Sequence, residues 1–252
     1  MISVCMATYN GEQFLRGQID SILCQLGLED ELIISDDGST DGTLEIIQSY
    51  NDKRIKLLHH EKKSEYAKIR YARNFYYATD NFENALKAAQ GDYIFLADQD
   101  DVWMDNRIPQ MTDALKNASL VMSNFTTCDE NGQIQIYNFY KKSPFSSSTT
   151  LNLIKSKFIG CCMAFDRETL VKALPFPRKL LAHDLWIGLI ASSSGTCSFV
   201  KEANIYYRRT GNNVSSTTKK SKNGFLFKLQ YRICIALQLA IHCFLKSLGV
   251  RP

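Results

Sequence analysis

The sequence lacks the cysteine patterns of common zinc sites and disulfide frameworks. Its 252 residues include eight cysteines, but no C-x-x-C pair occurs. Cys161 and Cys162 are adjacent, which suits neither a normal disulfide nor a zinc knuckle. Reduced thiols in a cytosolic protein fit this pattern best. Five cysteines lie among apolar residues and are expected to be small buried groups: Cys5, Cys24, Cys162, Cys234 and Cys243.

Long apolar runs and a strong charge of one sign are also missing. No stretch has 18 consecutive apolar residues, so a membrane-spanning helix is not expected. Residues 2–8 are apolar, but no basic segment precedes them, which argues against a secretory signal. The net charge is +4, so the whole-chain balance does not indicate nucleic acid as a partner. We therefore expect a globular protein located in the cytoplasm.

Neither glycine-rich phosphate loop, G-x-G-x-x-G or G-x-x-x-x-G-K-[ST], occurs, which excludes the nucleotide-binding classes that depend on them. Instead, the first half alternates apolar strands with amphipathic helices. We predict strands at 2–7, 32–34, 55–59 and 93–96, and helices at 11–25, 44–50 and 81–90, the last ended by Gly91. The strands are apolar throughout, which predicts a mainly parallel sheet with helices on both faces.

The second half is less regular. We predict helices at 108–116 and 182–192, a short helix capped by Asp166, and strands at 120–123, 133–140, 160–165, 198–200 and 205–207. Residues 143–150 are rich in Ser and Thr and are expected to form a loop. Residues 211–223 are polar and predict a linker.

The end of the chain is basic and amphipathic. Residues 219–252 contain seven Lys and Arg but no Asp or Glu. From Gly224 onward a helix is expected, with an apolar stripe formed by Phe225, Leu226, Leu229, Ile233, Ala236, Leu237, Ala240, Phe244 and Leu248. Such a helix suits the surface of an anionic membrane. The alternative is a helix docked on the protein's own core or on a partner.

The most informative motif is acidic. Asp98, Asp100 and Asp101 follow the apolar run 93–96 within a few residues. Carboxylates crowded at the end of a buried strand need a positive partner. A hard divalent cation is the usual one, and it can hold a substrate's phosphates as further ligands. The motif therefore suggests an enzyme that binds a phosphorylated substrate through a metal, and the alternative is a solvated acidic turn.

Two other turns are expected beside this motif, because the carboxyl ends of parallel strands meet at one edge of the sheet. Residues 7–12 offer the ring of Tyr9 and the hydroxyl of Thr8, and residues 36–43 offer the carboxylates of Asp36 and Asp37. Together the three turns predict a pocket for a nucleoside diphosphate. For 36–42 the alternative is a plain turn with a helix cap.

A further acidic residue lies far along the chain. His183 and Asp184 begin a predicted helix. Asp184 could act as a general base that His183 orients. The alternative is a pair that caps the helix.

With these motifs the chain resembles a known family, the family 2 glycosyltransferases of the GT-A fold, and within it the bacterial rhamnosyltransferase-like branch. Five segments carry the resemblance in the family's order over roughly residues 1–215: 7–11 (ATYNG), 35–43 (SDDGSTDGT), 91–103 (GDYIFLADQDDVW), 160–165 (GCCMAF) and 183–186 (HDLW). The implied fold is a mainly parallel, Rossmann-like sheet with a C-terminal amphipathic helical tail. The implied division is 1–103 for the nucleotide, 104–215 for the acceptor, and the tail 216–252.

The resemblance implies inverting sugar transfer from a nucleoside-diphosphate sugar, UDP- or dTDP-linked. The acceptor would be a saccharide, expected in lipid-linked form, used to build surface polysaccharide at the inner face of the membrane. Residues expected at the nucleotide are Ala7, Thr8, Tyr9, Glu12, Asp36, Asp37 and Asp98. Asp98 and Asp100 would bind Mg²⁺ or Mn²⁺, with Asp100 the direct ligand, and Asp184 would deprotonate the acceptor.

One departure from the family pattern motivates an alternative. Relatives in this branch often carry a His before Gly-Asn-Asn-Val-Ser, where this chain has Thr210. Arg208 and Arg209 could supply positive charge to the diphosphate instead. The alternative function is a non-catalytic scaffold of the same fold that tethers an assembly to the membrane. A sugar nucleotidyltransferase is not supported, because a glycine-rich basic loop after the first strand is missing.

Overall fold

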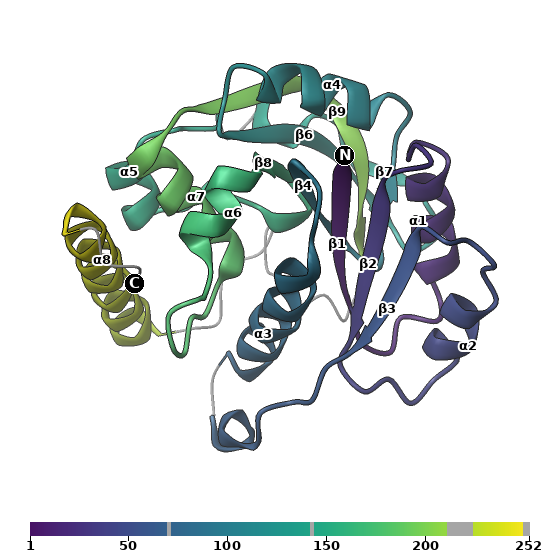
Figure 1. The fold of residues 1–252 in the computed structure, drawn as a ribbon, viewed down its shortest axis with the longest axis horizontal. Helices are drawn as coiled ribbons and strands as arrows, with labels where there is room; N and C mark the ends of the chain where they lie inside the picture. Colours follow the sequence, from purple (N-terminus) through teal and green to yellow (C-terminus); the bar gives the residue numbers. More distant parts are fainter. Residues whose placement is uncertain (70–71, 142–143, 211–223, 249–252) are drawn as a thin grey trace.

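The computed structural model describes residues 1–69, 72–141, 144–210 and 224–248. Its framework is one mixed sheet in the order β3-β2-β1-β4-β8-β6-β9-β5, with β7 paired to β6 (Figure 1). The strands are β1 (Ile2–Thr8), β2 (Glu31–Asp36), β3 (Ile55–His59), β4 (Tyr93–Asp98), β5 (Val102–Trp103), β6 (Leu120–Asp129), β7 (Ile134–Ile136), β8 (Met163–Asp166) and β9 (Cys197–Arg209). The first four strands are parallel, whereas β8 runs antiparallel to both β4 and β6. The predicted mainly parallel sheet is confirmed.

Helices surround this sheet (Figure 1). They are α1 (Leu15–Leu23), α2 (Thr43–Gln48), α3 (Arg73–Ala88), α4 (Arg107–Leu115), α5 (Thr149–Ile154), α6 (Arg167–Ala173), α7 (His183–Ser194) and α8 (Phe225–Ser247). Three short 3-10 turns lie at Ser64–Lys68, Phe139–Lys141 and Gly160–Cys162. Strand β2 is buried along its whole length, as expected for a parallel strand covered on both faces.

Helix α3 differs most from the prediction. It begins at Arg73, well before the predicted 81–90. The early start was not predicted because these turns carry Asn, Tyr and Thr, which are weak helix formers. Tertiary contacts hold these turns: the ring of Tyr76 stacks on Tyr66, and the side-chain amide of Asn81 donates to the carbonyl of Thr8 over 3.2 Å. Gly91 follows the helix for another reason than capping, because a Cβ there would lie 2.5 Å from the backbone nitrogen of Ser3.

The second half also contains departures. The predicted loop 143–150 includes the start of α5, where the Ser148 hydroxyl caps the helix by accepting from the amide of Leu151. The predicted strand 133–140 is reduced to β7. The two short strands predicted at 198–200 and 205–207 form one long strand, β9, which stays paired with β6 across register shifts. The predicted cap at Asp166 is confirmed, since its carboxylate accepts from the amide of Thr169 over 2.7 Å.

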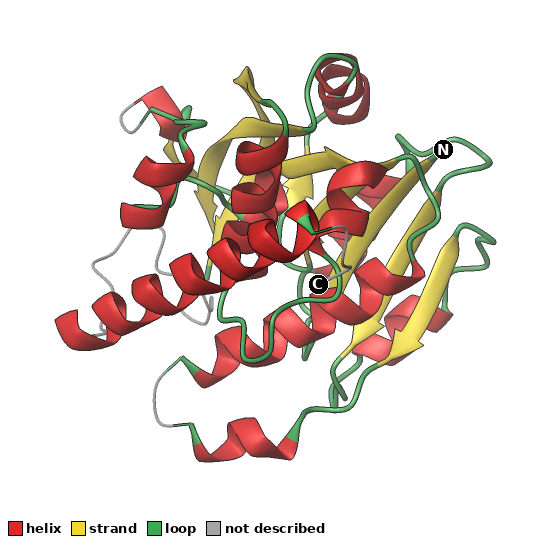
Figure 2. Cartoon of the chain, turned by 60° about the vertical axis from the view of Figure 1, so that its left-hand side comes forward, coloured by secondary structure: helices red, strands yellow, loops and turns green. Residues whose placement is uncertain are grey.

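The C-terminal helix α8 lies against α5 and α7 and is seen at the front in Figure 2. Three cysteines predicted to be buried are exposed, Cys24 on the edge of α1 and Cys234 and Cys243 on α8. The predicted linker 211–223 lies outside the described residues. Within the part of the chain that the structure describes, no helix combines the length and apolar character that a membrane crossing requires.

Candidate active site

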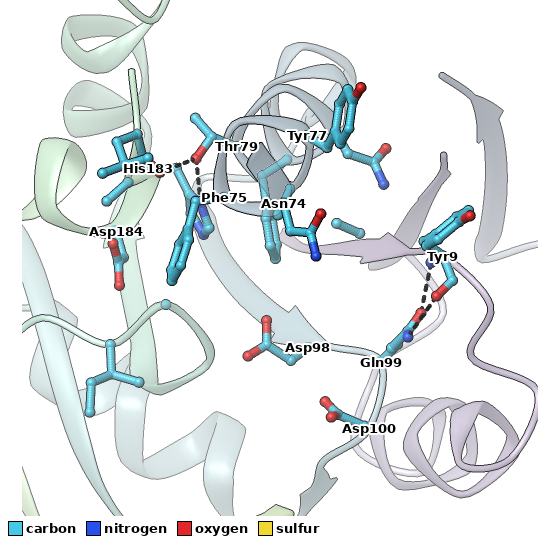
Figure 3. A pocket seen from close by; sticks show the side chains of 18 of the residues that line it. Tyr9, Asn74, Phe75, Tyr77, Thr79, Asp98, Gln99, Asp100, His183 and Asp184 are labelled. Atoms are coloured by element: carbon cyan, nitrogen blue, oxygen red, sulfur yellow. Dashed lines mark hydrogen bonds between the residues drawn. The ribbon is translucent and has the colours of Figure 1, made fainter. Parts of the chain in front are cut away.

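A cavity of about 1090 Å³ opens at the carboxyl ends of β1 and β4. The parallel register brings its walls together, because Ala7 pairs with Asp98 and Thr8 pairs with Asp36. Seven of the predicted site residues line this cavity: Ala7, Thr8, Tyr9, Asp37, Asp98, Asp100 and Asp184 (Figure 3). The volume is at the upper end of the range for small-molecule sites, which accommodates a large substrate or two substrates.

Two predicted nucleotide residues, Asp36 and Glu12, hold the turns instead of lining the cavity. The carboxylate of Asp36 is fully buried and accepts from the Thr8 hydroxyl and from the amides of Gly38 and Ser39. The carboxylate of Glu12 accepts from the amide of Gly42 over 2.7 Å. Both carboxylates hold the turns in this way, and their direct contact with a nucleotide stays a prediction.

Tyr9, in the turn after β1, and Asp37, in the turn after β2, line the cavity. Gln99 fixes the backbone of Tyr9 by accepting from its amide over 2.8 Å and donating to its carbonyl over 3.1 Å (Figure 3). The Lys62 ammonium lies 3.1 Å from the centroid of the Tyr9 ring, and His60 Nδ1 lies 2.8 Å from Asp37 Oδ1. Sequence reasoning gave no role to His60, Lys62 or Gln99: Gln99 lies within the acidic motif but is not one of its carboxylates, and no motif includes His60 or Lys62.

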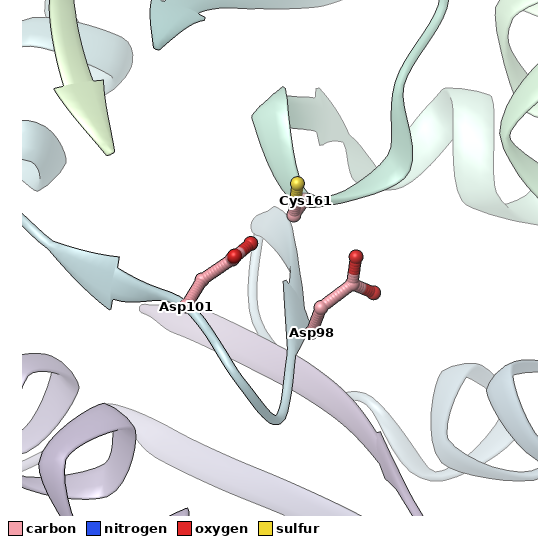
Figure 4. A group of neighbouring side chains, drawn as sticks. All are labelled: Asp98, Asp101 and Cys161. Atoms are coloured by element: carbon pink, nitrogen blue, oxygen red, sulfur yellow. The ribbon is translucent and has the colours of Figure 1, made fainter. Parts of the chain in front are cut away.

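The acidic motif forms a crowded group at the base of the cavity. Ligand atoms of Asp98, Asp101 and Cys161 all lie within 4.8 Å of one another (Figure 4). Burial and the charges of Asp100 and Asp184 raise the pKa of Asp98 to about 7. Burial also raises the pKa of Asp100 and of Asp101, while Arg208 opposes the shift at Asp100. Keeping these carboxyl groups together therefore lowers the stability of the fold.

The donor set of this group fits a hard divalent cation. One carboxylate oxygen of Asp101 is buried without a hydrogen-bond partner among the described residues, while the other accepts from the amide of Arg208. The pKa of the Cys161 thiol is raised well above its usual value, so the thiol stays protonated and is a poor ligand. Asp98 and Asp100 line the cavity and would hold the ion, with Asp101 behind them.

Asp184 lies on the wall formed by the first turn of α7. Its carboxylate accepts from the amide of Leu185 over 2.7 Å, so it satisfies a free amide of that turn and also faces the cavity. Burial raises the pKa of Asp184 to about 6, and the backbone amides of Leu185 and Gly160 limit the increase. A carboxyl group with this pKa is mostly ionised at neutral pH and can accept a proton.

His183 supports this wall as a neutral group. Its ring stacks on Phe82 with centroids 4.1 Å apart, and its Nδ1 lies 3.5 Å from the Thr79 hydroxyl. Burial lowers the pKa of His183 to about 3, so the imidazole carries no charge at neutral pH. These contacts tie the first residue of α7 to α3.

Helix α8 contributes to the cavity as well. Tyr231 and Arg232 line it, although the sequence placed them in a separate tail. Arg232 donates to the backbone carbonyl of Asn152 over 3.1 Å, which ties α8 to α5. The apolar stripe predicted only the face of this helix that carries it. It did not predict that residues on the opposite face would line the cavity.

Comparison with known families gives one broad match. A model described as "Glycosyl transferase family 2" matches residues 3–173. This span includes the turns of β1, β2 and β4 and the acidic motif, whereas Asp184 lies beyond it.

Individual relatives cover more of the chain. It is 30% identical over 230 residues to the UDP-Glc:alpha-D-GlcNAc-diphosphoundecaprenol beta-1,3-glucosyltransferase WfgD of Escherichia coli, covering 87% of this chain and 81% of that protein. It is 27% identical over 246 residues to the dTDP-rhamnosyl transferase RfbG of Shigella flexneri, covering 90% and 81%. The structure of S. aureus TarS 1-349 in complex with UDP-GlcNAc matches with a TM-score of 0.68 and 19% identity, over 94% of this chain and 66% of that one. The last likeness confirms a GT-A type fold.

The crowded carboxylates make a prediction about stability in the absence of divalent cations. An unfolded Asp titrates near pH 4, whereas folded Asp98 titrates at about 7, so the stability that the protonated form provides is lost as the pH rises through that interval. Asp98→Asn should therefore increase the free energy of unfolding by about 1 to 3 kcal/mol at pH 8 and by much less at pH 4. Urea unfolding with a chelator present measures both values.

The matched control is Asp113→Asn, which removes a carboxylate whose side chain is 80% exposed on α4. It should change stability little at either pH. Equal effects of the Asp98 and Asp113 substitutions would show that the acidic group is not strained.

Proposed function

The chain belongs to glycosyl transferase family 2, and from this premise we propose that it transfers a sugar from a UDP- or dTDP-linked donor to a saccharide hydroxyl, with inversion at the anomeric carbon. One observation carries the proposal. A single cavity is lined by Tyr9 and Asp37 from the turns after β1 and β2, by Asp98 and Asp100, and by Asp184. Donor, diphosphate and acceptor groups can therefore meet in one space.

Asp184 is the proposed general base. Its carboxylate would accept the proton of the acceptor hydroxyl while that oxygen forms a bond to the anomeric carbon and the bond from this carbon to the diphosphate oxygen breaks. A single displacement of this kind inverts the configuration. The electron pair of the broken bond leaves with the nucleoside diphosphate.

Asp98 and Asp100 are the proposed metal ligands. Mg²⁺ or Mn²⁺ held there would supply positive charge to the leaving diphosphate. Arg208 lies beside them, since its Nε donates to the Asp100 carbonyl over 2.9 Å. Thr210 also lines the cavity, and the neighbouring arginine provides charge that Thr210 does not.

The donor end is proposed at Tyr9 and Asp37. A nucleotide base can stack on the Tyr9 ring, which is 47% exposed, and the Asp37 carboxylate can accept from the base or ribose. The names of relatives contain UDP-Glc and dTDP-rhamnosyl, the two nucleotides that we propose. Membership of the rhamnosyltransferase-like branch stays a prediction. So does the division into a nucleotide half, 1–103, an acceptor half, 104–215, and a tail, 216–252.

We also propose that α8 binds the inner surface of the cell membrane, which would place the enzyme beside lipid-linked acceptors used in surface polysaccharide synthesis. Six large apolar side chains on α8, at helical spacing, are 46% to 79% exposed: Leu226, Leu229, Ile233, Leu237, Ile241 and Phe244. Leu151 and Ile154 of α5 extend this face at 56% and 71% exposure. Residues 219–252 contain seven Lys and Arg but no Asp or Glu, a charge balance that complements anionic headgroups.

The central prediction concerns Asp184. Asp184→Asn should lower kcat by about 10²- to 10⁴-fold, because the amide cannot accept the hydroxyl proton. In the wild-type protein kcat should rise with pH through about 6, as Asp184 ionises, and this limb should disappear in the variant. Transfer of labelled sugar to membrane lipids extracted from the host measures both effects.

The control for Asp184→Asn is donor binding, which should be retained. If the variant restores polysaccharide synthesis in cells that lack the wild-type chain, the general-base role is wrong and the scaffold function is favoured.

The membrane prediction tests the exposed stripe. The double substitution Leu237→Glu with Ile241→Glu should weaken binding to vesicles that contain anionic lipid by at least about tenfold, because the charges oppose burial among acyl chains. Leu28→Glu is the matched control, since Leu28 is 75% exposed in the loop between α1 and β2. Cosedimentation that is unchanged in the double variant would exclude this face from membrane binding.

A further inference from the structure

The inner face of α8 presents two side chains with further hydrogen-bond donors to the cavity. Tyr231 and Arg232 both line it. The Tyr231 hydroxyl is buried and has no hydrogen-bond partner among the described residues. Because a buried hydroxyl without a partner is costly, this group indicates a ligand atom that the protein itself does not supply.

Arg232 has most of its donors available. Its Nη1 donates to the Asn152 carbonyl, which uses one of the five N–H groups of a guanidinium. No carboxylate of the described residues lies within ion-pair distance of it, although its charge acts on Asp184. The side chain is half-buried, and burial lowers its pKa, so the cation lies in a site that solvates it poorly. An anionic ligand would satisfy both its charge and its remaining donors.

The surroundings select the class of anion. Lys155 and Lys157, which follow α5, also line the cavity, and Arg232 is hydrogen-bonded to α5 through Asn152, so this part of the cavity is basic. The acidic group lies at the base of the cavity on β4 and its following turn, so the donor's diphosphate has a separate proposed place. A planar guanidinium with further cations suits phosphate oxygens, which accept several hydrogen bonds at once.

The two faces of α8 are opposite in character. The outer face carries the exposed apolar stripe, whereas Ile235 and Leu239 are buried on the side that contains Arg232. A ligand with a phosphate next to a lipid chain could place its chain along the outer face and its phosphate at the inner one. This arrangement distinguishes a lipid-linked acceptor from a free saccharide.

We propose that Tyr231 and Arg232 form a subsite for the phosphate of a lipid-linked acceptor, and that they position its sugar hydroxyl near Asp184. The proposal rests on the proposed transferase function and specifies its acceptor class, a saccharide joined to a lipid through phosphate. Tyr231 and Arg232 act as positioning and specificity residues, while Asp184 remains the base.

The test is binding of a short-chain isoprenyl diphosphate to the full chain, measured by calorimetry without donor. Arg232→Gln should weaken binding by about 10- to 100-fold, and Tyr231→Phe by about three- to tenfold. Lys228→Gln is the matched control, because Lys228 is an exposed cation one turn earlier on the same helix and does not line the cavity. It should bind the probe as the wild type does. The corresponding isoprenyl alcohol, which has no phosphate, should bind weakly and equally to all four proteins.

Two further measurements distinguish the phosphate of a lipid-linked acceptor from the diphosphate of the donor and from membrane headgroups. The dissociation constant for UDP should be unchanged in Arg232→Gln, and a marked increase would assign the residue to the donor and overturn the proposal. Cosedimentation with anionic vesicles should also be unchanged, and a loss there without a loss of probe binding would assign Arg232 to lipid headgroups and overturn it as well. Equal loss of diphosphate and alcohol binding would show a structural role only.

This test is independent of catalysis. Asp184→Asn should bind the probe at least as tightly as the wild type does, since the base does not hold the phosphate and its negative charge acts on Arg232. If the wild type binds the probe through Arg232 but transfers no sugar, the transferase function fails and the subsite remains. If the wild type transfers sugar but does not bind the probe, the subsite is wrong and the transferase function remains. With an active preparation, Arg232→Gln should raise KM for a diphosphate-linked acceptor by about 10- to 100-fold, with little change in kcat or in KM for an alkyl glycoside.

Discussion

The site depends on the parallel pairing of β1 with β2 on one side and β4 on the other. This register places Ala7 beside Asp98 and Thr8 beside Asp36 at the same sheet edge. Hydrogen bonds then join the turns that follow, since the Asn10 amide donates to the Ser39 hydroxyl and the Gly11 amide donates to the Thr43 hydroxyl. A shift in the register of β1 would separate the nucleotide end from the acidic motif, so the chemistry follows from the pairing of three short strands.

Electrostatics sets the second constraint. The fold brings carboxyl groups from β4 and α7 into one cavity, and burial raises the pKa values of Asp98 and Asp184 to about 7 and about 6. Such crowding opposes stability in the free protein and favours binding of a cation with a diphosphate. Lys155, Lys157 and Arg232 line the same cavity, so it contains cationic as well as anionic side chains. We propose that the cations near α5 and α8 serve the acceptor and that the carboxylates on β4 serve the donor.

The sequence was sufficient for the parts of the molecule that repeat a strong local pattern. The apolar strands, the turn at Asp36 and the cluster at Asp98 each carry a signal within a few residues. The start of α3 at Arg73 could not be predicted, because tertiary contacts of Tyr76 and Asn81 outweigh weak helix propensity there. Lys62 and Arg232 reach the cavity from distant elements, and their positions depend on packing that no local pattern encodes.

The most direct test of the account is the thermal stability of the protein with UDP, dTDP, GDP and CMP, each with and without Mn²⁺. Binding to the folded state raises stability by about 2.7 kcal/mol when a ligand is present at 100 times its dissociation constant. The account predicts stabilisation by UDP or dTDP that is large with Mn²⁺ and small without it. Stabilisation by none of the four nucleotides would contradict a donor site in this cavity.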